Sequence, residues 1–343
     1  MRLSHLDILV CPQSKRPLIL KQGAVLDGER IKEGILLEPV TGKSYPITNF
    51  IPRFVSQDNY ARSFGVQWTI HNRTQYDAHS GFALSRKRFE SETRWTKDLR
   101  GEVILEVGSG AGRFTTHALE TGATVVSFDY SGAVDANLRS NGDKANLLLV
   151  QASVYEMPFR LDFFDKVFSF GVLQHTPDPR AALFAIVQHL KPGGRLAADI
   201  YAKTVRNWLL NTKYWVRPFI DRRNPQVLYG RLKRYIDFMW PLARLLRRVP
   251  RIGHTLNWRL LIADYSGMLP GADDATLKGW AYLDTFDILA PAHDHPATLK
   301  RLRRWYQEAG LVEIDVHYGH NGIEGRGRKP PSVETRPLKD ASV

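Results

Sequence analysis

From residue 103 onward, short apolar segments alternate with segments of helical periodicity. The apolar segments lie at residues 103–107, 124–128, 147–151, 166–170 and 195–200, and the helical segments between them at 112–120, 133–141 and 179–190. Strands that alternate with helices in this way build a parallel sheet with helices on its faces. Residues 191–194 include Pro192 and two glycines, which predicts a turn before the fifth strand. The pattern therefore predicts an α/β fold with a mainly parallel sheet.

The remaining segments differ in composition from this alternating part. Residues 1–55 contain short strand-like runs separated by turn residues, which predicts a small β-rich domain, and residues 56–100 predict a helical connector. A basic, aromatic-rich segment at 203–296 interrupts the sheet pattern, which resumes with a helix and a strand. We therefore expect a core at 101–202 and 297–320, a helical insertion between them, and a flexible tail at 321–343.

The net charge of +13 is concentrated in one segment. Residues 203–251 hold thirteen Lys or Arg and only two acidic residues, so an anionic partner or surface is indicated there. Cys11 is the single cysteine and cannot form an internal disulfide, and no secretory signal or membrane-spanning apolar run is evident. We therefore expect a soluble cytoplasmic protein.

A glycine-rich turn follows the first strand of the alternating part, in the run Glu106-Val107-Gly108-Ser109-Gly110-Ala111-Gly112. In an open α/β sheet, ligands bind beside such a turn, where the backbone and a helix N-terminus are accessible. A dinucleotide fingerprint needs Gly or Ala where this chain has Arg113, which disfavours NAD and FAD. The Glu106 carboxylate suits a cationic group such as the ammonium of a methionine moiety. The alternative is a tight turn beside a solvated Glu106.

An acidic residue ends the second strand of the alternating part. Asp129 lies about twenty residues after the glycines, where a carboxylate can accept both hydroxyls of a ribose. The alternative is that Asp129, or Ser131, caps the following helix.

Residues 103–200 resemble class I S-adenosylmethionine-dependent methyltransferases. The matching runs are Leu105 to Phe114, Phe128-Asp129-Tyr130-Ser131, Phe163 to Val167, Gly171 to Pro179 and Leu190-Lys191-Pro192-Gly193-Gly194. The resemblance implies a Rossmann-like fold with a mainly parallel seven-stranded sheet, a helical insertion after the fifth strand, and S-adenosylmethionine as cofactor.

The resemblance also implies roles for residues at matching positions. Glu106 and the loop from Gly108 through Ser109 and Gly110 to Gly112 would hold the methionine portion, with Asp129 on the ribose and Tyr130 on the adenine edge. Gly171, Leu173 and Gln174 would lie beneath the sulfonium. The family usually has an acid facing the adenine where this chain has Ser153, so Ser153 and the backbone of Val154 would substitute.

The N-terminal segment is similar to the Trm112-like zinc-ribbon family. The similarity rests on the run from Leu6 to Pro12 and on the run from Tyr45 to Pro52. A structural zinc needs four ligands, yet Ser14 stands at the second cysteine position and residues 38–42 contain no cysteine. We therefore predict no metal and a Cys11 that acts as a small buried hydrophobe.

Several residues are candidates for the acceptor side of the site. His175 is a candidate general base because its ordinary pKa suits proton removal near neutrality, although it could equally serve only to hydrogen-bond its loop. Trp68, Tyr201, Asp287 and His293 are further candidates, and Trp68 could instead be a core residue.

The insertion contains an amphipathic basic helix, which we expect to bend at Pro241. Its apolar stripe comprises Leu228, Leu232, Tyr235, Ile236, Met239, Leu242, Ala243 and Leu246. The helix could be a lid, an RNA-binding element, or an element on an anionic membrane surface, for which Trp208, Trp215, Trp240 and Trp258 are suited. We predict methyl transfer to O or N of a small-molecule or glycan/lipid-linked acceptor. The alternatives are an RNA methyltransferase and a non-catalytic cofactor- or partner-binding protein.

Overall fold

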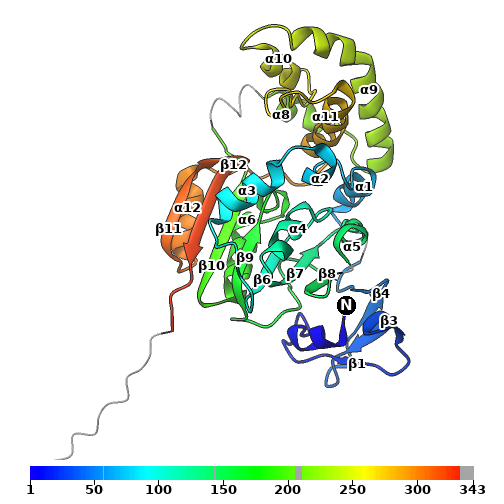
Figure 1. Ribbon diagram of the computed structural model, residues 1–343, viewed down its shortest axis with the longest axis vertical. Helices are drawn as coiled ribbons and strands as arrows, with labels where there is room; N and C mark the ends of the chain where they lie inside the picture. Colours follow the sequence, from blue (N-terminus) through cyan, green and yellow to red (C-terminus); the bar gives the residue numbers. More distant parts are fainter. Residues whose placement is uncertain (57, 143, 205–210, 333–343) are drawn as a thin grey trace, which may run out of the picture.

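The computed structural model describes residues 1–56, 58–142, 144–204 and 211–332 (Figure 1). A small N-terminal sheet lies at one end, a larger sheet flanked by helices occupies the middle, and a cluster of helices covers the other end. The predicted α/β class, with its N-terminal β domain and its insertion after the fifth strand of the large sheet, is confirmed.

The N-terminal domain is an antiparallel sheet that follows a short 3-10 helix, η1 (Leu3–Ile8). Its strands are β1 (Ile19–Leu20), β2 (Val25–Asp27), β3 (Arg30–Leu37), β4 (Ser44–Thr48) and β5 (Ile51–Pro52). Leu36 and Ile47 are buried between exposed or half-buried neighbours, which is the pattern of a sheet with one face on a core. Cys11 is fully buried, and its Sγ lies 3.3 Å from the Tyr45 hydroxyl.

The large sheet has seven strands in the order β11-β12-β10-β9-β6-β7-β8. Its strands are β6 (Val103–Val107), β7 (Thr124–Asp129), β8 (Leu147–Gln151), β9 (Phe164–Ser169), β10 (Leu190–Ile200), β11 (Val312–Gly319) and β12 (Gly322–Arg328). The five from β6 to β10 are parallel, and only the pairs of β12 with β10 and β11 are antiparallel. The strand order reverses between β6 and β9, and ligands bind at such reversal points.

Helices pack on both faces of this sheet. The connector helices are α1 (Arg62–Ile70), α2 (Asp77–Ser80) and α3 (Leu84–Thr93), and the core helices are α4 (Arg113–Glu120), α5 (Val134–Asn141), η2 (Leu173–His175), α6 (Pro179–His189) and α12 (Leu299–Glu308). Ile104 packs in the cluster that contains residues of α3, α4 and α5, whereas its neighbour Leu105 packs in the cluster of α6 and α12. Because successive strand residues point to opposite faces, strands buried on both sides are apolar throughout.

Two expectations about the chain after residue 190 are wrong. Residues 191–194, predicted as a turn, lie within β10, where strand pairing is irregular between Leu190 and Arg195. The tail expected from residue 321 begins instead with β12. Its glycines are structural, because a Cβ on Gly325 would lie 2.7 Å from the buried ring of Tyr306. Composition alone did not distinguish such packing glycines from a flexible segment.

The insertion forms its own helical layer (Figure 1). It consists of α8 (Thr212–Val216), η3 (Arg217–Phe219), α9 (Pro225–Leu246), α10 (Gly253–Arg259) and α11 (Asp274–Leu289). Its ends meet at the sheet, where Ala297 donates a backbone hydrogen bond to Tyr201. Helix α9 continues through Pro241, and its buried stripe includes Leu228, Leu232, Ile236 and Ala243 as predicted. Tyr235 and Leu242, predicted on that stripe, are exposed. Trp208 lies outside the described residues.

No helix within the described part of the chain combines the length and the apolar character needed to cross a bilayer.

Candidate active site

A cavity of about 520 Å³ lies at the carboxyl ends of the parallel strands. The loops after β6, β7, β9 and β10 form its floor, and residues of α1 and α11 form much of the opposite wall. Its position coincides with the reversal in strand order, where the loops after neighbouring strands diverge and leave a crevice. A volume of this size is typical of small-molecule sites.

The loop after β6 leaves no room for side chains. Gly108 has a φ of +80°, and a Cβ on it would lie 2.3 Å from Cγ2 of Val172. Gly110 has a φ of +52°, and a Cβ there would lie 3.1 Å from the indole of Trp68. Both glycines line the cavity, so their backbone is exposed to whatever binds there. Gly112 instead lies behind the loop, against the side chain of Asn137.

Asp129 ends β7 and holds this loop in place. Its Oδ2 accepts a 2.9 Å hydrogen bond from the backbone N–H of Gly110, while its Oδ1 accepts from the backbone and hydroxyl of Ser131. Burial raises the pKa of Asp129, although these hydrogen bonds oppose the shift. The carboxylate lines the cavity beside Tyr130 and Val154. Asp129 thus links the loop after β6 to the end of β7. This structural role is additional to the predicted role of accepting the ribose hydroxyls.

Not every residue predicted to contact the cofactor lies in the cavity wall. Glu106 is buried behind the loop, where its Oε2 accepts hydrogen bonds from the Thr115 hydroxyl and, at 2.7 Å, from that of Ser127. Burial raises the pKa of Glu106 to about 7. The other predicted residues outside the wall are Gly112, Ser153, Leu173 and Gln174. Ser109 and Gly171 line the cavity as predicted.

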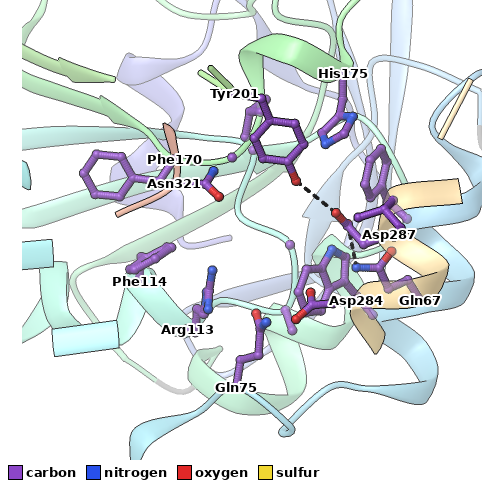
Figure 2. A pocket seen from close by; sticks show the side chains of 18 of the residues that line it. Gln67, Gln75, Arg113, Phe114, Phe170, His175, Tyr201, Asp284, Asp287 and Asn321 are labelled. Atoms are coloured by element: carbon purple, nitrogen blue, oxygen red, sulfur yellow. Dashed lines mark hydrogen bonds between the residues drawn. The ribbon is translucent and has the colours of Figure 1, made fainter. Parts of the chain in front are cut away.

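A hydrogen-bonded group on the far wall joins three separate parts of the chain. Asp287 of α11 accepts hydrogen bonds from Nε2 of Gln67 at 2.9 Å and from the hydroxyl of Tyr201 at 3.1 Å (Figure 2). Trp68, Tyr201 and Asp287, all predicted on the acceptor side, line the cavity. His293 does not line it.

His175 lines the cavity between these two walls. Its Nδ1 lies 3.1 Å from the carbonyl oxygen of His293, so this nitrogen carries the ring proton and Nε2 is left as the basic atom. Its ring packs edge-on against Tyr201, with centroids 5.4 Å apart. Burial lowers the pKa of His175 below its ordinary value, although the charge of Asp287 opposes this. The imidazole is therefore neutral near pH 7.

Many polar residues of the cavity wall were not predicted, and Asp284, Arg113 and Asn321 are three of them. Asp284 lies one helical turn before Asp287, so helical spacing could have indicated it. In the sequence, Arg113 was evidence only against a dinucleotide-binding fingerprint, yet its side chain lines the cavity (Figure 2). Asn321 lies in the β11–β12 turn, which the sequence placed in the flexible tail, so no signal pointed to it.

One group of side chains in the described part of the chain could hold a metal ion. Glu92, His320 and Glu324 place one ligand atom each within 4.8 Å of one another. Glu92 already pairs with Arg88 at 2.5 Å, and Glu324 with His320 at 3.2 Å. The second oxygen of Glu92, Oε2, is buried without a hydrogen-bond partner.

The sequence matches known methyltransferases. Residues 105–198 match a family model described as a methyltransferase domain. The chain is 35% identical over 106 residues to a demethylmenaquinone methyltransferase from Clavibacter sepedonicus, covering 30% of this chain and 43% of that protein. It is 29% identical over 177 residues to a ubiquinone biosynthesis O-methyltransferase from Xanthomonas oryzae pv. oryzae, covering 50% of this chain and 68% of that protein. The chain thus spans less than half of the first of these relatives.

Solved methyltransferase structures are more distant. A complex between the Haloferax volcanii Trm112 methyltransferase activator and a methyltransferase matches with 14% identity and a TM-score of 0.44, over 80% of this chain and 99% of that chain. An O-methyltransferase family protein from Burkholderia thailandensis matches with 12% identity and a TM-score of 0.45, over 80% of this chain and 64% of that chain. Both scores are below 0.5, so the assignment depends on the sequence match and the strand order. Residues 105–198 match a methyltransferase domain and supply the parallel strands on either side of the reversal in strand order.

The buried Glu106 carboxylate should make stability depend on pH. Its pKa is raised from 4.5 to about 7 in the folded protein, so the folded state binds this proton more tightly than the unfolded state does. The stability that Glu106 contributes is therefore complete below pH 4.5 and is lost as the pH rises through 7. Relative to wild type, Glu106→Gln should gain about 3 kcal/mol of unfolding free energy across that interval, measured by urea denaturation.

Glu29→Gln is the matched control, because the Glu29 side chain is 85% exposed. If the free energies of unfolding of wild type and Glu106→Gln changed with pH in parallel, the burial of the Glu106 carboxylate would be contradicted.

Proposed function

We propose that this protein transfers a methyl group from S-adenosylmethionine to an oxygen or nitrogen atom of a small-molecule or glycan/lipid-linked acceptor. The observation that carries the proposal is the junction of Gly110 with Asp129, which brings an exposed backbone loop and a carboxylate together in one cavity wall. When bound, the cofactor supplies a methyl group on a sulfonium, which is a good leaving group.

The residues of this wall fit such a cofactor. Gly108, Ser109 and Gly110 would hold the methionine portion, because the loop offers backbone groups without side chains. Asp129 would accept the ribose hydroxyls, and Tyr130 and Val154 would contact the adenine. Glu106 would act through the loop, by holding Thr115 and Ser127 behind it.

Replacement of Asp129 tests the cofactor site. Asp129→Asn should weaken the binding of S-adenosylmethionine and S-adenosylhomocysteine about tenfold or more in titration calorimetry, because charged hydrogen bonds to the ribose are lost. Asp98→Asn, at a carboxylate that is 59% exposed, is the matched control. Failure of folded wild type to bind either compound would contradict the proposal. Binding without transfer to any acceptor would favour a non-catalytic cofactor-binding protein.

His175 is our candidate for the base that removes a proton from the acceptor. Its Nε2 is unprotonated, it lines the cavity, and its ring is held by the His293 carbonyl and by Tyr201. The proton of an acceptor hydroxyl or amine would pass to Nε2 as the acceptor attacks the methyl carbon.

Kinetics of His175→Gln test this role once a screen has supplied an acceptor. We expect kcat to fall by about 10² or more, with S-adenosylhomocysteine affinity unchanged. Because burial lowers the pKa of His175, the wild-type rate should stay level down to a pH below the ordinary histidine value of 6.5 and fall only at lower pH. A variant with the wild-type rate and pH profile would leave His175 a purely structural residue.

We further propose that the insertion lies on an anionic membrane surface and that the acceptor is lipid-linked. Helix α9 and the residues after it present a second, outward apolar stripe, in which Phe238 is 82% exposed, Leu245 58% and Ile252 54%. Exposed arginines interrupt and flank this stripe at 231, 234, 248 and 251. Apolar side chains among cations suit an anionic bilayer, whereas binding to an RNA backbone requires the cations alone. The relatives named in quinone biosynthesis are consistent with a lipid-like acceptor.

Vesicle sedimentation tests this surface. Binding should require anionic lipid and should weaken about tenfold or more in Phe238→Asp or Leu245→Asp, because each change removes a buried apolar contact with the bilayer. Val40→Asp, at an apolar side chain that is 72% exposed on the N-terminal domain, is the control. RNA binding with steep salt dependence, and no vesicle binding, would favour the RNA alternative.

We also propose that residues 1–55 are related to Trm112-like zinc ribbons and have lost the metal ligands. In support, the turn where the second ligand pair would lie is fixed by Glu38, which is fully buried and accepts hydrogen bonds from the backbone N–H of Val40 at 2.9 Å and of Thr41 at 3.0 Å. A carboxylate thus orders this turn through hydrogen bonds to its backbone. Zinc bound to the purified protein would contradict this proposal.

A further inference from the structure

Two charged side chains in the cavity wall have polar atoms that no hydrogen bond or ion pair satisfies. Asp284 of α11 has a buried Oδ2 with no hydrogen-bond partner, although Tyr265 interacts with this carboxyl group. Arg113 begins α4 and lies over the Phe114 ring, 4.4 Å from its centroid, but within the described residues no carboxylate oxygen lies within the 4.0 Å of an ion pair and no hydrogen bond to its guanidinium is found. Figure 2 shows both side chains directed into the cavity from different elements. The two groups face the same space without contacting each other.

Two other ionisable groups of the cavity, in contrast, are paired. Arg88 pairs with Glu92 at 2.5 Å and with Asp199, and Asp287 accepts from Gln67 and Tyr201. The unsatisfied polar atoms of Arg113 and Asp284 are therefore not a feature of every ionisable group in this cavity. Burying a charge without a partner is costly, so such a pair is expected where a ligand supplies the missing contacts.

Burial perturbs both groups. It raises the pKa of Asp284 to about 7, and the charge of Asp287 adds to the shift. It lowers the pKa of Arg113 to about 10, and the charge of Arg88 adds to that shift. An anionic group beside Arg113 and a hydrogen-bond donor beside Asp284 would each favour the charged form, and perturbed groups of this kind cluster at functional sites.

The position of the pair favours the acceptor over the cofactor. Asp284 belongs to the insertion, outside the matched methyltransferase domain at residues 105–198. The charge of Asp284 raises the pKa of Arg113, so this arginine lies near a carboxylate of the insertion. The wall here is also aromatic, with Phe114, Phe170, Tyr265 and Trp280. Aromatic walls accept flat rings by stacking or edge-on packing.

We propose that Arg113 and Asp284 bind the methyl acceptor, and that the part of the acceptor held in the cavity is a hydroxylated aromatic acid. The guanidinium donates hydrogen bonds to the acceptor's carboxylate, and Asp284 accepts one from its hydroxyl. The aromatic side chains contact the ring. This inference rests on the proposed methyl transfer and deepens it, because it names the chemical class that the cavity selects. Arg113 and Asp284 are specificity-determining residues, and the base role stays with His175.

Calorimetry of the full chain saturated with S-adenosylhomocysteine tests the inference. The probes are 4-hydroxybenzoate and its 3-hydroxy isomer, with phenol and benzoate as compounds that each lack one group. Wild type should bind a hydroxybenzoate at least tenfold more tightly than phenol or benzoate. Arg113→Gln should abolish the preference over phenol, and Asp284→Asn should abolish the preference over benzoate, with S-adenosylhomocysteine affinity unchanged within about twofold.

Two additional variants keep the test decisive. Arg113→Lys retains the charge if Arg113→Gln does not fold, and it should bind hydroxybenzoate less tightly than wild type because a bidentate contact is lost. Arg244→Gln, at an arginine that is 60% exposed, is the matched control and should bind all probes as wild type does.

The remaining outcomes overturn the inference. If wild type binds the cofactor product but does not prefer hydroxybenzoates, or if the variants keep that preference, the pair does not select this acceptor. If the variants weaken S-adenosylhomocysteine but not 5′-methylthioadenosine, which lacks the amino-acid end, the pair holds the cofactor instead. In each of these cases the proposed methyl transfer stands, whereas it falls only if wild type fails to bind the cofactor.

Discussion

The hydrogen bond between the Gly110 N–H and the Asp129 carboxylate is the contact on which the cavity depends. It holds the loop after β6 against the end of β7, at the side of the sheet where the strand order reverses. Positive φ at Gly108 and Gly110 lets the backbone follow this path, and Val172 and Trp68 occupy the space that side chains would need. Loop, strand end and neighbouring side chains thus determine one another's positions.

The opposite wall is assembled from parts that are distant in the sequence. Asp287 accepts from Gln67 of α1 and from Tyr201 at the end of β10, so one carboxylate connects the connector, the core and the insertion. The insertion also meets the sheet at its own ends through the Tyr201–Ala297 backbone contact. The helical layer is therefore part of the cavity and not an appendage, and its inner and outer faces have different chemistry: buried carboxylates inside, apolar and basic side chains outside.

Alternation of short apolar segments with helical segments was enough to predict the sheet, because strands buried on both faces must be apolar throughout. The glycine run and Asp129 were likewise predictable, since their spacing reflects local backbone geometry. The first part of the flexible tail was predicted wrongly because Gly325 is required by the ring of Tyr306, a contact between residues that only the folded chain brings together. The rest of the predicted tail, 333–343, lies outside the described residues. Glu106 was predicted beside the ligand, but its carboxylate lies behind the loop. Its position in the strand was evident from the sequence, whereas the side to which its carboxylate points was not.

The sequence by itself determined the α/β class, the glycine loop and the acidic strand end, all of which depend on local periodicity and on backbone conformation. Only the tertiary structure decided which polar groups share the cavity. Arg113 and Asp284 are far apart in the chain, and neither spacing nor composition indicates that both carry unsatisfied polar atoms in one cavity. Whether a buried charge is paired depends on the packing of several elements around it, and that packing exists only in the folded protein.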